Sequence, residues 1–288
     1  MGYETYDITL ILCGIILRFV SEVPLRVSEE IDVFRTDALP DITVPVRNGT
    51  IRLPAEQYAG SPVTMCASEG DWLLSAKKTE RETTTIVVRY RPDFSASEIL
   101  VDAEHCGHDI RQVCSILQCF PIRALLAKYD AVLLHSSRIE LGGSAVVFSA
   151  PSGTGKTTQA RLWAKYAGAR IVSNDRTIVR RVGGRFVTSG FPVDGSEPVL
   201  DPAIIPLGAL VLLRQGAENR AEQLPAGQAL ALLMEQTALN SRDGPGMTQA
   251  LLFWSEVLAH CPVYRLTCTP DERAVRCLQK ALERNGGE

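Results

Sequence analysis

The sequence has no long hydrophobic run, no excess of basic residues and no Cys-x-x-Cys pair. The stretch from Ile8 to Leu17 is nearly all apolar, but a membrane-spanning helix needs about 20 such residues, roughly twice that length. Its Ile and Leu content and the interruption at Gly14 favour a β-strand over a membrane anchor. These features predict a chain without a membrane partner.

Charge and cysteine content narrow the range of partners and metals. The 30 Lys and Arg residues are outnumbered by 33 Asp and Glu, and they are scattered along the chain. A protein that holds nucleic acid by its phosphates usually carries a basic excess, so nucleic acid is not expected as a partner. The eight cysteines occur without a secretory signal, a combination typical of buried thiols in a cytoplasmic protein. His105, Cys106 and His108 fit no common zinc spacing, and no metal is expected there.

The composition is that of a globular α/β protein with two domains. Apolar residues make up 45% of the chain and charged residues 22%. Residues 1–103 contain short apolar runs separated by Pro, Gly, Asp and Asn, which predict a small antiparallel β-rich domain without a chemistry-bearing motif. Residues 104–288 alternate between strand and helix patterns, which predict an α/β catalytic domain.

The second domain is expected to begin with a helical stretch, residues 109–129, that Pro121 interrupts. Strands are expected at 131–140, 144–149, 170–174, 177–182, 185–189 and 207–213. Helices are expected at 156–167, 226–239, 247–259 and 271–284.

The strongest motif is Ala-Pro-Ser-Gly-Thr-Gly-Lys-Thr at residues 150–157, between the apolar strand Ala145–Phe148 and a helix. This context is what a nucleotide phosphate loop requires. Its glycines let backbone N–H groups turn toward phosphates, and the helix N-terminus adds a positive field. Lys156 can reach the β- and γ-phosphates, and the Thr157 hydroxyl can bind Mg²⁺. Ala150 stands where the general pattern has its first glycine, so a Gly-rich strand-to-helix turn remains the alternative.

Two Gly-Gly turns predict which residues lie beside this loop. Gly142-Gly143 suits a two-residue hairpin, which would pair Ile139 with Val146, Ser137 with Phe148 and His135 with Ala150. This register brings His135 to the start of the loop, although a buried core histidine is an equally good interpretation.

The second turn, Gly183-Gly184, would pair Arg180 with Val187, Ile178 with Ser189 and Asp175 with Pro192. Asp175 would then lie at a strand end, where ligands of open α/β sheets gather. Asn174 precedes it, so no neighbouring carboxylate raises its pKa, and we expect it to be ionised at neutral pH.

Three further polar side chains are expected at the same rim, each with an exposed turn as the alternative. They are Asp194, Ser196 and Glu197. Arg214, at the end of a later strand, could stabilise phosphate charge or could simply be solvated.

The block LLHSSRIELGGSAVVFSAPSGTGKTTQARLW, followed by IVSNDRTIVRR, resembles the HPr kinase/phosphorylase family, whose catalytic fold is that of the ATP-dependent phosphoenolpyruvate carboxykinases. The resemblance is good over residues 130–197 and looser toward the C-terminus. Within that family the loop has the form x-x-S-G-x-G-K-[ST], which accommodates Ala150. The family's active-site His matches His135, and the second Asp of its Asp-Asp pair matches Asp175. The family's later glycine-rich signature is missing, because residues 190–197 differ from it.

The resemblance implies an ATP- and Mg²⁺-dependent kinase that phosphorylates a serine or threonine of a protein or peptide. Asp175 would be the base, assisted by His135, and Lys156 would stabilise the transferred group. The residues expected to bind the nucleotide are Ser152, Gly153, Thr154, Gly155, Lys156, Thr157, Thr158 and Arg214. The residues expected to bind the metal are Thr157, Asp175 and Glu197. A homo-oligomer is possible, and two other functions stay open: a small-molecule hydroxyl kinase, and a non-catalytic nucleotide-gated module that binds a peptide or protein.

Overall fold

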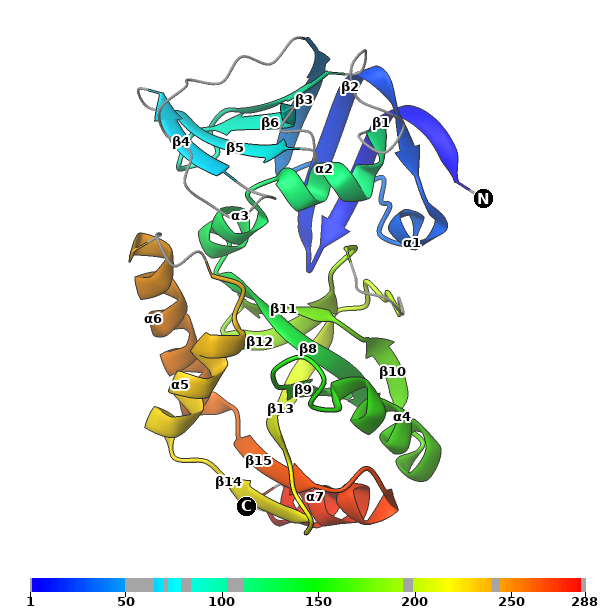
Figure 1. The fold of residues 1–288 in the computed structure, drawn as a ribbon, viewed down its shortest axis with the longest axis vertical. Helices are drawn as coiled ribbons and strands as arrows, with labels where there is room; N and C mark the ends of the chain where they lie inside the picture. The colour runs from blue at the N-terminus through cyan, green and yellow to red at the C-terminus, as the bar shows by residue number, and fades with distance from the viewer. Residues whose placement is uncertain are drawn as a thin grey trace. The chain divides into compact units, whose positions relative to one another are not determined.

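The computed structural model of the chain describes residues 2–49, 65–69, 72–78, 84–102, 111–193, 199–239 and 244–285. The chain divides into two compact units, Met1–Lys128 and Tyr129–Glu288, each with its own β-sheet (Figure 1). The first unit extends past residue 103, where the composition changes, because helix α2 (Val113–Cys119) packs on strands of the first sheet. Phe120, which follows α2, lies with its ring centroid 5.9 Å from that of Phe19 and 6.1 Å from that of Phe94.

The described strands of the first unit form one sheet in the order β1-β2-β3-β7-β6-β5-β4. Their bounds are β1 (Tyr3–Leu12), β2 (Ile15–Val27), β3 (Ile42–Asn48), β4 (Met65–Glu69), β5 (Trp72–Lys78), β6 (Thr84–Tyr90) and β7 (Ser97–Val101). The prediction of a purely antiparallel sheet is wrong, because β3 runs parallel to both β2 and β7. After β2 the chain passes through α1 (Glu29–Asp32) and a connecting segment, and this crossover lets β3 run in the same direction as β2.

The apolar N-terminal stretch and the helical stretch around Pro121 fold as predicted. Ile8–Leu17 spans the β1–β2 hairpin, whose turn residues Cys13 and Gly14 have φ of +53° and +79°. No helix within the described ranges is long and apolar enough to span a membrane. The helical stretch is interrupted at Phe120 and Pro121, between α2 and α3 (Ile122–Lys128).

The second unit has a mixed sheet with helices on both faces. Its strands are β8 (Ala131–Leu141), β9 (Ser144–Ser149), β10 (Arg170–Ser173), β11 (Arg176–Val182), β12 (Arg185–Gly190), β13 (Ile205–Gln215), β14 (Arg220–Gln223) and β15 (Val263–Cys268). Its helices are α4 (Lys156–Ala167), α5 (Ala226–Gln236), α6 (Gly244–His260) and α7 (Glu272–Asn285). The sequence analysis missed β15, which pairs in parallel with β13, and β14, which pairs with β15. Both are short and carry arginines that obscure the strand pattern.

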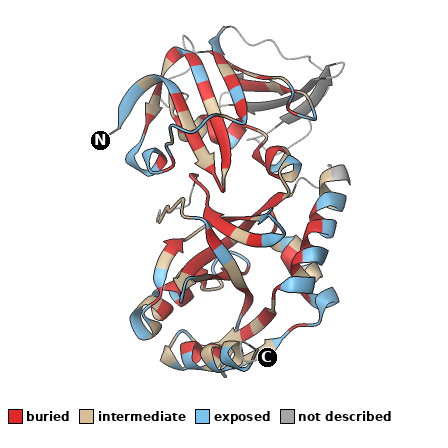
Figure 2. Ribbon diagram, turned by 180° about the vertical axis from the view of Figure 1, so that it is seen from behind, coloured by how far each residue is buried: buried red, intermediate tan, exposed pale blue. Residues whose placement is uncertain are grey.

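The buried residues of β13 show how the two faces are covered. Leu210 and Leu212 belong to a cluster with Trp254 of α6, whereas Val211 belongs to a cluster with Trp163 of α4. Successive side chains of a strand point to opposite faces, so α4 and α7 cover one face of β13, and α5 and α6 the other. Figure 2 shows the buried residues along these strands and the exposed residues on the outer sides of the helices.

Both Gly-Gly hairpins form with the predicted register. Ile139 pairs with Val146 and Ser137 with Phe148. The ladder ends at Ser136 and Ser149, however, because the chain leaves β9 at Ala150 to begin the phosphate loop. The predicted pair of His135 with Ala150 is therefore not a ladder pair, although the Ser149 hydroxyl donates to the His135 carbonyl at 2.8 Å.

The second hairpin pairs Ile178 with Ser189 as predicted and ends at Thr177 and Gly190. Asp175 is therefore not paired with Pro192, because β12 ends at Gly190, whose N–H donates to the Asp201 carbonyl. Asp175 does lie at a strand end, as predicted: it is in the two-residue turn between β10 and β11, which pair one after the other with β8. Between them the Ser136 N–H donates to the Asp175 carbonyl at 2.9 Å.

Candidate active site

The loop between β9 and α4 has the backbone conformation that phosphate binding needs. Gly153 and Gly155 have φ of +76° and +109°, a region that other residues rarely adopt. Ala150 is buried and is not among the residues with positive φ, so alanine fits the position where the general motif has glycine. Helix α4 begins at Lys156, directly after the loop, so its first N–H groups are available to an anion.

Lys156 is held inside the loop. Its side chain is buried, and Nζ donates to the carbonyls of Ala150 at 2.8 Å and Pro151 at 3.3 Å. Its own carbonyl accepts a hydrogen bond of 2.8 Å from the buried Ser137 hydroxyl. Burial lowers the pKa of Lys156, and the charge of Asp175 opposes that change. The ammonium group is therefore placed in the loop before any ligand arrives.

Asp175 lies between two cationic or polar partners. Its Oδ1 is 3.4 Å from His135 Nε2, and its Oδ2 is 3.4 Å from Arg176 Nε. The hydrogen bond from His135 lowers the pKa of Asp175; burial opposes this change, and the charges of Arg176 and Lys156 support it. The expectation of an ionised carboxylate at neutral pH agrees with this direction. His135 reaches Asp175 because β11 pairs Arg176 directly with His135.

The other residues expected to bind the nucleotide differ in their exposure to solvent. Ser152 and Thr158 are exposed, and Thr154 and Thr157 are partly buried. Arg214 is exposed on β13, two residues after Leu212, which pairs with Ser149 at the start of the loop. Gln215, next to Arg214, touches the loop: its Nε2 donates to the Gly153 carbonyl at 3.3 Å.

A family model supplies the relationship of the chain to known proteins. The model for the SynChlorMet cassette protein ScmC matches residues 100–252, more than half of the chain. The chain belongs to the ScmC family. The matched region contains every site residue discussed above, including the phosphate loop, His135 and Asp175.

Two other comparisons add little to the ScmC assignment. No curated protein matches the chain. Among solved structures, the HPr(Ser) kinase/phosphatase from Coxiella burnetii matches 54% of this chain and 95% of its own, with 8% identity and a TM-score of 0.30. The function of this ScmC-family protein is therefore argued from the residues of its site and not from that likeness.

Some residues of the ScmC-family protein that the sequence analysis considered for the site or for a metal are not described by the structure. Asp194, Ser196 and Glu197 lie outside the described residues, as do His105, Cys106 and His108. Three residues that touch the site were missed by the sequence analysis: Ser137, Arg176 and Gln215. The predicted hairpin register already placed Ser137 one strand from the loop, and Arg176 directly follows Asp175, so both had a signal in the sequence.

Removing the imidazole in the variant His135→Ala should raise the pKa of Asp175. The hydrogen bond from His135 is the largest cause of the lowered pKa, and burial, which opposes it, remains in the variant. Titration of the side-chain carboxyl carbon by NMR, with Asp175→Asn used to assign the resonance, measures the change directly. An Asp175 pKa that is unchanged or lower in the variant would show that the two side chains do not interact.

Proposed function

We propose that this protein is a kinase that transfers the γ-phosphoryl group of ATP to a serine or threonine hydroxyl of a peptide or protein. The observation that carries the proposal is the position of Asp175. Its carboxylate lies 3.4 Å from His135, whose carbonyl accepts a hydrogen bond from the hydroxyl of Ser149, the residue that leads into the phosphate loop. A carboxylate in that place can accept the proton of a hydroxyl group that attacks the γ-phosphorus.

Three features of the loop support a nucleoside triphosphate as the phosphoryl donor. The glycines at 153 and 155 adopt positive φ, the helix N-terminus directly follows, and Lys156 is fixed at the loop. The ammonium group of Lys156 is held within the loop by two backbone carbonyls. Phosphate oxygens of a bound nucleotide can replace these carbonyls as hydrogen-bond acceptors. The loop thus offers both backbone N–H groups and one fixed cation to the phosphates.

Mg²⁺ fits the residues present, provided that it arrives with the nucleotide. In the described part of the chain no group of three or more His, Cys, Asp or Glu side chains could hold a metal. Mg²⁺ usually binds through one or two protein ligands together with substrate phosphates. Thr157, in the first turn of α4, and Asp175 would supply those protein oxygens, and the ion would neutralise charge on the phosphates.

Each side chain then has a defined part in the transfer. Asp175 accepts the proton of the acceptor hydroxyl, and His135 and Arg176 hold its carboxylate in place from either oxygen. Lys156 offsets the negative charge of the transferred group. Positioning and electrostatic stabilisation of this kind supply most of the catalysis in phosphoryl transfer.

The test is whether ADP formation depends on an added acceptor. The purified protein with Mg²⁺ and γ-³²P-labelled ATP is assayed in three ways: alone, with free serine, and with an array of serine- and threonine-containing peptides. We expect label on peptides and an increase in ADP only when peptide is present. Label on free serine would instead identify a small-molecule kinase. Slow ADP formation that no acceptor stimulates would overturn the proposal in favour of a nucleotide-gated binding module.

A further inference from the structure

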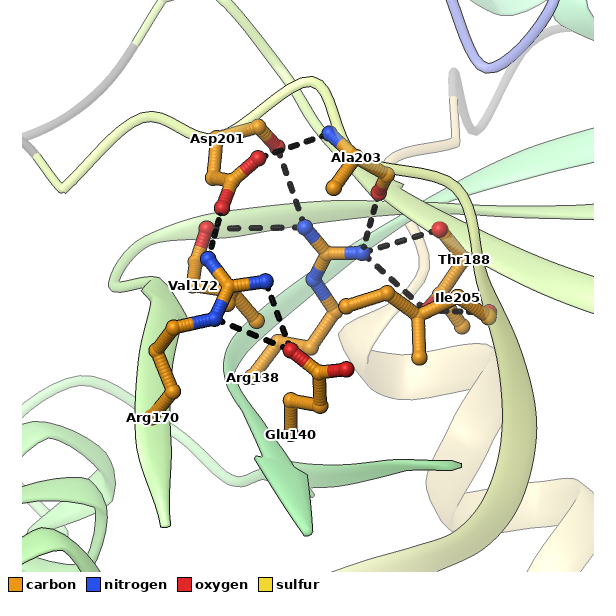
Figure 3. A network of polar contacts seen from close by, with 8 residues as sticks. All are labelled: Arg138, Glu140, Arg170, Val172, Thr188, Asp201, Ala203 and Ile205. Atoms are coloured by element: carbon orange, nitrogen blue, oxygen red, sulfur yellow. Dashed lines mark hydrogen bonds and ion pairs between the residues drawn. The ribbon is translucent and has the colours of Figure 1, made fainter. Parts of the chain in front are cut away.

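Two arginines of the second unit, Arg138 and Arg170, form a polar network that takes no direct part in the chemistry proposed above. Arg138 of β8 is fully buried, and its guanidinium group binds backbone carbonyls from several chain segments (Figure 3). Its Nη1 donates to the carbonyl of Thr188 at 2.8 Å, to the Thr188 hydroxyl at 3.2 Å and to the carbonyl of Ala203 at 3.1 Å. Its Nη2 donates to the carbonyl of Asp201 at 3.0 Å and makes a longer contact of 3.5 Å with the carbonyl of Val172.

The carbonyls meet at Arg138 because the chain is irregular there. Val172 lies where the pairing of β10 with β8 shifts by one residue, between Ile171 and Ser173. Residues 201–204 lie outside the strands, and Asp201 passes so close to Gly190 that a Cβ atom there would lie 2.7 Å from the Asp201 carbonyl oxygen. Buried carbonyls outside a ladder need donors, and only the arginine side chain offers five in one plane.

Arg170 holds the same segments from the solvent side. Its guanidinium binds the carboxylates of Glu140 and Asp201, the first with Nε at 2.9 Å. Asp201 also accepts from the Ala203 N–H at 2.8 Å. Burial would raise the pKa of Asp201, but the bonds from Ala203 and Arg170 outweigh it, and the pKa is lowered. Asp201 is thus an ionised anchor that ties residues 201–203 to the start of β10.

These segments adjoin the candidate active site. Ser173, directly after Val172, forms a β-bridge with Leu200 and donates its hydroxyl to the Arg176 carbonyl at 2.7 Å. Asp175 lies between Ser173 and Arg176 in sequence. The backbone on both sides of Asp175 is therefore tied to residues 200–203, and both parts are tied to Arg138.

We infer that Arg138 is a positioning residue for phosphoryl transfer: by binding the carbonyls at 172, 188, 201 and 203, it holds the β10–β11 turn that carries Asp175 and the neighbouring 199–203 segment as one unit. This inference rests on the proposed function, which supplies the role of Asp175. None of the hydrogen bonds of the Arg138 side chain given above reaches residues 150–157. We therefore expect a conservative change at Arg138 to alter the placement of Asp175 more than nucleotide binding.

The main test compares Arg138→Lys with the wild-type protein. Lysine keeps the charge but offers three donors from one atom, which cannot serve all of these carbonyls. We expect kcat for the peptide acceptor to fall about 10²-fold, the cost of misplacing a catalytic group by about 1 Å. Affinity for Mg-ATP, measured by calorimetry, should stay at the wild-type value. Arg181→Lys is the matched control, because Arg181 binds the exposed carboxylates of Asp130 and Glu256 and should leave kcat unchanged.

Hydrogen–deuterium exchange tests the inference without any activity measurement. In Arg138→Lys, exchange should rise together in residues 172–176 and 199–205 and should stay unchanged in residues 156–167. Thr188→Val removes the hydroxyl that accepts from Arg138 and donates to the Ile205 carbonyl, and it should have a smaller effect in the same direction.

Different results separate the inference from the proposed function. Wild-type protein without acceptor-dependent transfer would reject the kinase, while the exchange pattern would still decide the role of Arg138. A normal kcat in Arg138→Lys, or exchange that rises over the whole unit or in only one of the two segments, would reject Arg138 as a positioning residue.

Discussion

Replacing Asp175 by asparagine is expected to lower the rate of phosphoryl transfer about 10²–10⁴-fold, the usual contribution of a general base. The amide keeps the shape of the side chain but cannot accept the proton of the attacking hydroxyl. The lowered pKa of Asp175 means that the wild-type carboxylate is already ionised at neutral pH, so the variant removes a charge that is present. Single-turnover measurement of the labelled peptide gives the transfer rate free of product release.

The affinity of the Asp175→Asn variant for Mg-ATP distinguishes two roles of this residue. If Asp175 is only the base, calorimetry should give the wild-type affinity. If it is chiefly a metal ligand, the affinity measured with Mg²⁺ should fall and the affinity measured without Mg²⁺ should not. A variant with normal transfer and normal affinity would show that Asp175 only shapes the strand, and the mechanism proposed here would be wrong.

Replacing Lys156 by alanine should weaken nucleotide binding about 10- to 150-fold, because a hydrogen bond to a charged group contributes roughly 1.5–3 kcal/mol. Turnover should be lost, since the same ammonium neutralises charge on the transferred group. The control is Lys165→Ala, a change in the same helix at a lysine whose Nζ lies 4.8 Å from the Tyr166 ring centroid. Equal affinities for Mg-ATP in wild-type protein and Lys156→Ala would reject the phosphate loop.

Local sequence patterns predicted most of the second unit. The Gly-Gly turns fixed the register of two hairpins, because positive φ at both turn residues admits one pairing of the flanking strands. The phosphate loop was evident for the same local reason: its glycines, lysine and following helix are contiguous in the chain. The strand β15 was missed because its pairing partner, β13, lies far away in sequence and its own pattern is short.

The surroundings of Asp175 could not be predicted in this way. Extending the first hairpin register by one residue and the second by two gave partners for His135 and Asp175 that the structure does not have. A register holds only while both strands continue, and both β9 and β12 leave their ladders before that point. His135 meets Asp175 through the pairing of β8 with β11, strands separated by the whole phosphate loop and helix α4.

The sequence by itself determined that the chain has a phosphate loop, the residues that form it and the strands that lead into it, because these depend on neighbouring residues. Only the tertiary structure decided which side chains surround Asp175 and that a buried arginine binds the segments beside it. Arg138 has an unremarkable place in a strand pattern, and its function depends on carbonyls that lie 34 to 65 residues away. Such contacts form because buried polar backbone must find donors wherever the fold brings the chain out of its ladders.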